Sequence, residues 1–216
     1  YRVKLPPTPN FRKELVSILN YIPHLNSISF VGYYGEPTLN KNLLDFLKIA
    51  EDVRNELTWT YNKPKLTLFT NSSTIYFKEI RERVKQFELV LAKLDVGFDD
   101  DFKRTNRPNP LTPKIQVLID SLVKLKQEMP NQHKLAVQCL IYNSYKEDFI
   151  ANSNSDNIAN IAHALKRIKP DMVQIYSTAR IPAEYFVYAI DNERKREIAS
   201  IFKEIINDDK IEINIY

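Results

Sequence analysis

A glutamate on a glycine-rich turn is the first candidate for chemistry. Residues 28–31 form a short apolar run, and residues 32–39 then read Gly-Tyr-Tyr-Gly-Glu-Pro-Thr-Leu, with two of the three glycines in the chain. Glycine lets a ligand come close to the backbone, and proline fixes the turn that presents the carboxylate of Glu36. A carboxylate beside open backbone suits the ammonium group of a ligand, so Gly35, Glu36 and Pro37 form a candidate binding turn. A tight turn with a solvated glutamate is the alternative interpretation.

Polar residues on one face of the expected strands form a second candidate site. Side chains alternate along a strand, so residues of one parity share a face. In four expected strands the polar residues fall on one parity, while the other parity is apolar and should pack on helices. The polar parity should face a common, ligand-bearing space, and its members are Asn71, Lys93, Asp95, Gln138 and Gln174. The alternative is a set of hydrogen-bonded polar residues in a packed core.

Three polar stretches outside the strands leave alternatives open. Lys103, Arg104 and Arg107 form a basic cluster on an expected loop above Asp95, where they would meet the phosphate of a nucleotide or RNA, or pair with nearby aspartates. Residues 99–101 are three aspartates, which we expect in a loop or at a helix N-terminus. Residues 152–157 form a polar loop that ends in an expected helix cap, and this loop is either a mobile lid or an inert connection.

The elements that must position these residues alternate between two apolar periods. Helical spacing occurs near residues 11–22, 43–50, 80–87, 115–125, 158–165 and 198–206, and short apolar runs occur near 28–31, 66–69, 89–92, 135–141, 172–176 and 211–215. This alternation predicts an α/β fold with parallel strands and helical crossovers. Five main strands after an opening helix predict a partial (β/α)6 TIM-like barrel that lacks its first strand, with an open doubly wound sheet as the alternative. We expect one domain over residues 1–216, in which 190–216 add a last helix and a closing strand.

The composition argues against several classes of protein. The formal net charge of +4 is too small to indicate nucleic-acid binding by itself. The single cysteine, Cys139, cannot form an internal disulfide, which fits a reducing cytosol, and it is expected as a small buried hydrophobe on the helix-facing side of its strand. No apolar run approaches the ~20 residues of a membrane helix, so we expect a cytoplasmic protein without a membrane partner. The three histidines lack the spacing of metal ligands.

The glutamate turn resembles a motif of a known family. Gly35-Glu36-Pro37 resembles the GGE-type motif of radical S-adenosylmethionine (SAM) enzymes, which contacts the methionyl amino group of SAM. Between about residues 28 and 184 further segments keep the order of that family, and they are residues 69–73 (Phe-Thr-Asn-Ser-Ser), 94–97, 102–108, 137–138, 170–176 and 180–184. The most similar subgroup comprises Fe–S oxidoreductases related to tRNA wybutosine-synthesising enzymes and glycyl-radical activases.

The resemblance implies roles for individual residues. Its expected cofactor-binding residues are Gly35, Glu36, Pro37, Thr70, Asn71, Ser72, Asp95, Gln138 and Gln174. Asp95 would point toward the SAM ribose or the substrate, while Gln138 and Gln174 would lie on the fifth and sixth strands behind the cofactor. Lys93 replaces a small residue of the subgroup, and it would bind an anionic substrate group or neutralise Asp95. The expected substrate-binding residues are Lys93, Arg104 and Arg107.

The resemblance also implies cofactors and a reaction. In that family three cysteines hold a [4Fe–4S] cluster, SAM is reductively cleaved there, and the 5′-deoxyadenosyl radical takes a hydrogen atom from a substrate. Because Cys139 is alone, we expect a Cys-x3-Cys-x2-Cys segment upstream of Tyr1 and an inactive isolated portion, with no metal ligands in these residues. An electron donor such as flavodoxin or ferredoxin would be a partner, and RNA or a nucleotide is a candidate substrate. The alternative is a degenerate barrel that binds an adenosyl ligand or RNA without radical catalysis. Removal of the Glu36 carboxylate is expected to weaken SAM binding and to affect stability little.

Overall fold

Among the residues that the structure describes, the main sheet has six strands, all of them parallel. The computed structural model describes residues 3–22, 24–32 and 35–216. The strands lie in the order β1-β2-β3-β4-β6-β8, and their bounds are Ser27–Phe30, Lys65–Thr70, Leu89–Lys93, Lys134–Leu140, Met172–Tyr176 and Glu212–Ile215. A separate antiparallel ribbon pairs β5 (Tyr142–Ser144) with β7 (Val187–Ala189).

Helix α1 precedes the first strand, and the later helices form the crossovers between neighbouring strands of the main sheet. Their bounds are α1 Phe11–Tyr21, α2 Leu43–Glu56, α3 Lys78–Val84, α4 Asp99–Asn106, α5 Ile115–Glu128, α6 Ser155–Ile168 and α7 Asn192–Ile206, with a short 3-10 helix, η1, at Pro37–Leu39. Parallel strands require such connections, because the chain must return to the same edge of the sheet before each new strand. Among the described residues, no helix has the length and apolar character that a membrane crossing requires.

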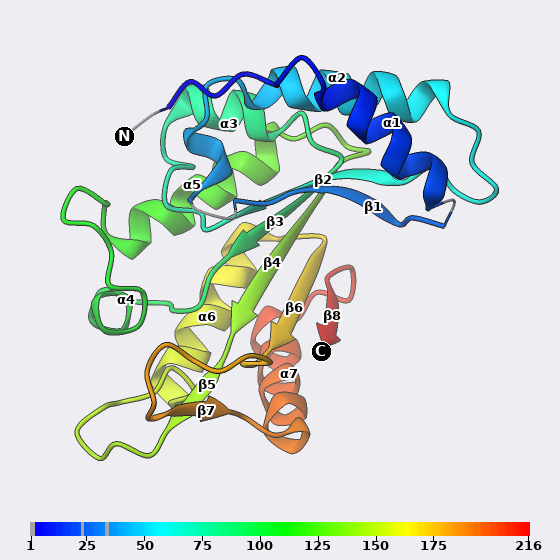
Figure 1. The fold of residues 1–216 in the computed structure, drawn as a ribbon. Helices are drawn as coiled ribbons and strands as arrows, with labels where there is room; N and C mark the ends of the chain where they lie inside the picture. Colours follow the sequence, from blue (N-terminus) through cyan, green and yellow to red (C-terminus); the bar gives the residue numbers. More distant parts are fainter. Residues whose placement is uncertain (1–2, 23, 33–34) are drawn as a thin grey trace.

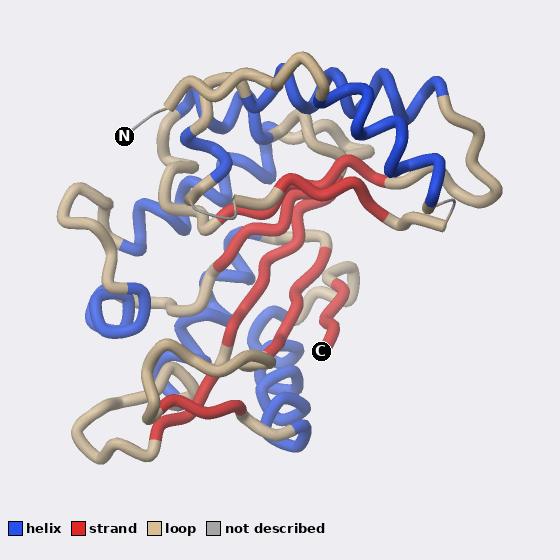
Figure 2. Tube along the Cα trace, in the orientation of Figure 1, coloured by secondary structure: helices blue, strands red, loops and turns tan. Residues whose placement is uncertain are grey.

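The strand order distinguishes the two folds that the sequence left open. Strands follow one another across the sheet in chain order, whereas a doubly wound sheet reverses its order at a switch point. Figure 1 shows β1 and β2 crossing the upper part of the molecule and β3, β4 and β6 turning downward, and Figure 2 shows the same strands as one twisted red band. The sheet stays open at β1 and β8, so the expected partial TIM-like barrel is confirmed.

The two faces of the strands differ as the parity predicted. The apolar parity of β3 and β4 joins the helices in one hydrophobic core and is fully buried at Val90, Ala92, Val137 and Cys139. The polar parity of the same strands stays half-buried at Lys93 and Gln138. Cys139 is a free thiol in the helix-facing core, as expected, and burial raises its pKa well above the ordinary value.

Two parts of the fold were not foreseen from the apolar pattern. Residues 99–106 form helix α4, so Lys103 and Arg104 lie on a helix rather than on a loop, and the three aspartates occupy its first turn. The β5–β7 ribbon extends the chain beyond the ends of β4 and β6, and Figure 1 shows it at the lower edge of the molecule. The expected cap at the end of the polar loop is present, because the Asn154 side chain accepts a hydrogen bond from the Asn157 N–H at the start of α6.

Candidate functional site

A cavity of about 570 Å³ lies where the main strands end. Active sites of β/α barrels collect at the carboxyl ends of the strands, because the connecting loops meet there. The cavity is lined by Val31, Gly32, Gly35, Glu36, Pro37, Phe69, Thr70, Asn71, Lys93, Gln138 and Tyr176. The structure therefore brings the glycine-rich turn after β1 together with the polar ends of β2, β3 and β4.

Four hydrogen bonds hold the carboxylate of Glu36 in the cavity wall. The hydroxyls of Thr38 and Thr70 each donate to Oε1 at 2.7 Å, and the N–H of Thr38 donates to the same oxygen at 3.3 Å. The N–H of Asn71 donates to Oε2 at 2.8 Å. A carboxylate has about four acceptor positions, two on each oxygen. Oε1 is therefore saturated, while Oε2 keeps room for one donor from a ligand.

These bonds change the expected part that Glu36 plays in the fold. The carboxylate links the turn after β1 to the end of β2, and Thr38, one of its donors, is fully buried. A loss of Glu36 would leave donors of Thr38, Thr70 and Asn71 without this acceptor, and such losses are costly when the groups are shielded from water. These contacts argue against the solvated-glutamate alternative, and they predict a larger effect on stability than the small one expected from the sequence.

The two glycines of the turn, Gly32 and Gly35, are each favoured at their position for a different physical reason. A Cβ on Gly32 would lie 1.5 Å from the carbonyl oxygen of Gly35, so the two peptide segments approach too closely for any side chain there. A Cβ on Gly35 would meet no atom within 4 Å, although the residue lines the cavity. A side chain at Gly35 would thus occupy space that is open to a ligand, whereas glycine leaves the backbone accessible.

Lys93 and Tyr176 also line the cavity, and their side chains lie close to each other. The ammonium nitrogen of Lys93 lies 5.8 Å from the centre of the Tyr176 ring, a distance at which a cation is attracted to the ring face. Burial opposes the charged form of Lys93, but Asp95 and Tyr176 outweigh this effect and raise its pKa. Lys93 is therefore an ammonium group at neutral pH. Tyr176 and Phe69 were not among the expected site residues, although both share a strand face with expected ones.

Gln138 and Gln174 pair side by side on β4 and β6. The register aligns the two residues, and Gln138 Nε2 donates to Gln174 Oε1 at 2.8 Å. Gln138 lines the cavity, whereas Gln174 lies behind it and orients the Gln138 amide.

Asp95 lies outside the cavity, in a buried polar network. Its Oδ1 accepts from the Leu140 N–H at 2.9 Å, and its Oδ2 accepts from Asn106 Nδ2 at 3.4 Å. Burial raises the pKa of Asp95, and the effects of Lys93, Leu140 and Asn106 oppose this shift only in part. The residue shares a face with Lys93 as predicted, but the polar interior closes over it. Its expected contact with a ligand stays a prediction.

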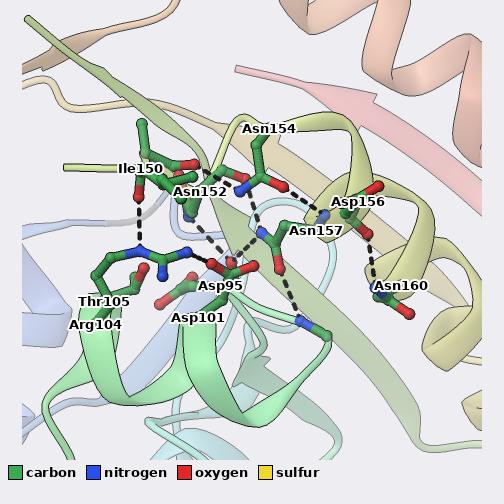
Figure 3. Close-up of polar contacts among 12 residues, drawn as sticks. Asp95, Asp101, Arg104, Thr105, Ile150, Asn152, Asn154, Asp156, Asn157 and Asn160 are labelled. Carbon is green, nitrogen blue, oxygen red and sulfur yellow. Dashed lines mark hydrogen bonds and ion pairs between the residues drawn. The ribbon is translucent and has the colours of Figure 1, made fainter. Parts of the chain in front are cut away.

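Buried asparagines hold Asp95 and the segment that follows it (Figure 3). Asn152 Nδ2 donates to the carbonyl of Asp95 at 3.0 Å and to that of Leu140 at 2.7 Å. Asn157 Nδ2 donates to the carbonyls of Asn152 and Asp95 at 2.7 and 3.2 Å, and Asn157 Oδ1 accepts from the Gly97 N–H at 2.9 Å. Both asparagines are completely buried. The polar loop at 152–157 is thus a structural tie between β3, β4 and α6, which argues against a mobile lid.

The remaining expected site residues do not line the cavity. Ser72 is buried with φ 67°, and its hydroxyl donates to the carbonyl of Lys93 at 2.8 Å. Arg104 pairs with the buried Asp101, and its Nε donates to the carbonyl of Ile150 at 2.8 Å (Figure 3). Arg107 pairs with Glu184 at 2.6 Å. Arg104 therefore takes the expected alternative of pairing with a nearby aspartate, whereas Arg107 pairs with a glutamate of a distant segment. In the parts of the chain that the structure describes, no cluster of histidine, cysteine or carboxylate side chains could hold a metal ion.

Comparison with solved structures places this architecture among known folds. A domain of the pyruvate-formate lyase-activating enzyme from Bacteroides vulgatus superposes with a TM-score of 0.61 at 15% identity, covering 88% of this chain and 99% of that chain. Streptococcus suis SuiB bound to S-adenosylmethionine gives a TM-score of 0.61 at 15% identity, covering 95% of this chain and 43% of that chain. SuiB has also been solved with its precursor peptide SuiA, and that structure gives a TM-score of 0.60 at 14% identity over all of this chain and 44% of that one. The chain has the radical SAM fold. The resemblance seen in the sequence is confirmed at the level of the fold.

Sequence comparisons identify distant relatives of this chain. No protein-family model matches it. UPF0026 protein MJ1312 of Methanocaldococcus jannaschii is 25% identical over 181 residues, covering 83% of this chain and 50% of the relative. UPF0026 protein slr1464 of Synechocystis is 24% identical and covers 81% and 57%, and a protein named GTPase Obg of Brachyspira hyodysenteriae is 24% identical and covers 88% and 25%. The chain thus spans between a quarter and somewhat more than half of the length of these relatives.

Proposed function

We propose that the cavity binds S-adenosylmethionine and that residues 1–216 are the substrate-side domain of a radical SAM oxidoreductase. A [4Fe–4S] cluster held elsewhere in the protein would supply the electron for reductive cleavage of SAM and so allow hydrogen abstraction from a substrate, while the residues of this cavity would hold and orient SAM. The observation that carries the proposal is the carboxylate of Glu36, which is fixed by four hydrogen bonds at the cavity wall and keeps an acceptor position on Oε2. The shared fold supports the same assignment.

The residues of the cavity suit the parts of SAM. Glu36 would bind the methionyl ammonium group, because a charge-assisted hydrogen bond to a fixed carboxylate is about twice as strong as a neutral one. Gly35 would let the ligand approach the backbone, since nothing lies within 4 Å of the position of its missing Cβ. Phe69 and Tyr176 offer aromatic surface to a planar base, and Gln138 offers a hydrogen-bonding amide.

The chain does not offer ligands for the cluster. An Fe–S cluster is held mainly by cysteine thiolates, and these 216 residues contain only Cys139. That thiol is fully buried on the helix-facing side of β4, and burial raises its pKa, which disfavours the thiolate. The cluster ligands and an electron donor such as flavodoxin or ferredoxin are therefore assigned to parts outside these residues.

The same cysteine content favours a second candidate function. A barrel that binds an adenosyl ligand or RNA without cleaving SAM needs the cavity but no cluster. The name GTPase Obg suggests no third candidate, because the chain has no Gly-x-x-x-x-Gly-Lys-Ser/Thr phosphate loop among its three glycines.

Calorimetric titration with SAM tests the binding step. Glu36→Gln keeps the size of the side chain but places an amide where Oε2 would meet the ammonium, so we expect the SAM affinity to fall by about tenfold to a hundredfold. Glu51→Gln, at an exposed glutamate on α2, is the matched control and should bind as the unaltered chain does. An unaltered chain that fails to bind SAM, or Glu36→Gln that binds it equally well, would contradict the proposal.

A cleavage assay on the full-length protein separates the two candidates. After reconstitution with iron and sulfide and reduction with dithionite, the enzyme should release 5′-deoxyadenosine from SAM. SAM binding without any 5′-deoxyadenosine would instead favour the binding protein.

A further inference from the structure

A chain of two buried threonine hydroxyls stands behind the carboxylate of Glu36. The hydroxyl of Thr38 donates to Glu36 Oε1 at 2.7 Å, and its oxygen also lies 2.5 Å from the hydroxyl oxygen of Thr74. Thr38 is completely buried and Thr74 is nearly so. Neither threonine lines the cavity, so the two hydroxyls can act on a ligand there only through Glu36.

The direction of the two hydrogen bonds follows from the number of protons. A hydroxyl has one proton to donate, and an ionised carboxylate can only accept. The proton of Thr38 therefore goes to Glu36, and Thr74 must donate to the oxygen of Thr38. A hydroxyl that accepts one hydrogen bond is polarised and donates more strongly in the next. Thr74 thus strengthens the bond between Thr38 and Glu36.

The place of Thr74 in the fold gives Glu36 a second connection to the end of β2. Thr70 is the last residue of β2 and donates to the carboxylate directly, whereas Thr74 lies between β2 and α3 and acts through Thr38 in η1. Both connections end on Oε1. Because that oxygen is held from two sides, Oε2 stays beside the Asn71 N–H and keeps the acceptor position that the proposed function uses.

We propose that Thr74 is a positioning residue, which directs the Glu36 carboxylate toward the ammonium group of SAM by donating a hydrogen bond to Thr38. The assignment rests on the proposed function, because it takes SAM as the ligand of Glu36. A residue outside the cavity then affects the affinity for SAM, and its effect is confined to the amino-acid end of the ligand.

Calorimetric titration of the full-length protein with SAM and with 5′-methylthioadenosine tests the proposal. The second ligand keeps the adenosyl group but lacks the amino-acid part that Glu36 would bind. Thr74→Val keeps the shape of the side chain and removes the donor. We expect it to weaken SAM binding by about threefold to tenfold, the effect of one neutral hydrogen bond, and to leave binding of 5′-methylthioadenosine unchanged.

Two more variants at the same position separate the hydroxyl from the packing of the side chain. Thr74→Ser keeps the hydroxyl and should bind SAM as the unaltered protein does. Thr74→Ala removes the hydroxyl and leaves no methyl group against the Thr38 oxygen, so it should show the same pattern as Thr74→Val.

Thr67→Val is the matched control for a general loosening of the fold. Thr67 is also a buried threonine, on β2, and its hydroxyl accepts from that of Ser27 at 2.6 Å, outside the cavity. We expect Thr67→Val to bind both ligands as the unaltered protein does.

The amide resonance of Asn71 reports the position of Glu36 without any ligand. The Asn71 N–H donates to Oε2 at 2.8 Å, so a displaced carboxylate changes its chemical shift. We expect Thr74→Val to move this resonance in the NMR spectrum of the full-length protein, and Thr74→Ser and Thr67→Val to leave it in place.

Three outcomes would overturn the proposal. They are an unchanged SAM affinity in Thr74→Val, an equal loss of affinity for SAM and for 5′-methylthioadenosine, and an Asn71 resonance that Thr74→Val does not move. An unaltered protein that does not bind SAM, in which Thr74→Val still moves the Asn71 resonance, would instead refute the proposed function and leave the link from Thr74 to Glu36 standing.

Discussion

Asn157→Ala tests whether the buried asparagine network holds the site in place. The side chain is completely buried at the start of α6 and makes three hydrogen bonds to backbone groups (Figure 3). These bonds connect α6 to the carbonyl of Asp95 and the N–H of Gly97, just beyond the end of β3. Lys93 is the last residue of β3, so the network fixes the segment that follows a cavity-lining residue.

The size of the effect follows from which groups lose a partner. The carbonyl of Asp95 still accepts from Asn152 in the variant, so it remains satisfied. The N–H of Gly97 and the carbonyl of Asn152 each lose their bond to Asn157. Asn152 is completely buried and Gly97 is half-buried, and a buried polar group without a partner costs about 1–3 kcal/mol, so the two losses together predict a destabilisation of about 3 kcal/mol. Because the whole stability of a domain is only about 5–15 kcal/mol, this loss should be easy to measure.

Urea unfolding followed by far-UV circular dichroism measures the loss. Asn160→Ala is the matched control, because Asn160 is the same residue type on the same helix but exposed, and its side chain bonds only to the Asp156 carbonyl one turn earlier, at 2.8 Å. The control should unfold close to the unaltered chain, and Asn157→Ala should unfold at a clearly lower urea concentration with an unchanged slope. Equal midpoints for the two variants would refute the reasoning, because the buried bonds would then contribute nothing beyond an exposed one.

Two further predictions concern packing and pH. Gly97→Ala would place a Cβ 2.5 Å from a carbonyl carbon and 2.7 Å from an amide nitrogen of the α6 backbone, so it should lower the free energy of unfolding by about 2 kcal/mol, and an unchanged urea midpoint would contradict this close approach. Burial opposes ionisation of Asp171, but Lys126 and the Leu135 N–H outweigh it and lower the pKa below the ordinary 3.8. The ionised group therefore stabilises the fold above that pH, and the contribution is lost as the pH falls below it. Urea midpoints across this range should fall less in Asp171→Asn than in the unaltered chain, while the exposed Asp209→Asn should behave as the unaltered chain does.

The architecture could be predicted from the sequence because burial of one face imposes a helical or strand period on the apolar residues. Helices and strands with a continuous apolar face lie where the spacing predicted them, including the closing strand, which is β8 at Glu212–Ile215. Helix α4 was not predicted because only two of its eight residues, Asp101 and Phe102, have buried side chains. Strands β5 and β7 were not predicted because three residues each are too few to define an apolar pattern. Strand pairing at such a ribbon is long-range, so local propensity does not reveal it.

The residues that line the candidate cavity could be predicted only in part from the sequence. Strand parity placed Asn71, Lys93 and Gln138 on one face, and the structure confirms that all three line the cavity. Parity also included Asp95 and Gln174, which share that face but lie outside the cavity. Strand parity predicts on which face of the sheet a side chain lies. How deeply the side chain is buried and which groups it contacts depend on the loops that cover the strand ends.

The sequence by itself determined the kind of fold, the strand faces and the turn that carries Glu36, because apolar period and glycine and proline content act locally. Only the tertiary structure decided which polar groups bond to one another within the protein and which remain available to a ligand. Arg104 and Ser72 bond to other groups of the protein, while one oxygen of Glu36 and the ammonium of Lys93 can still accept or donate a hydrogen bond to a ligand. That division depends on contacts between residues tens of positions apart, and such contacts exist only after the chain has folded.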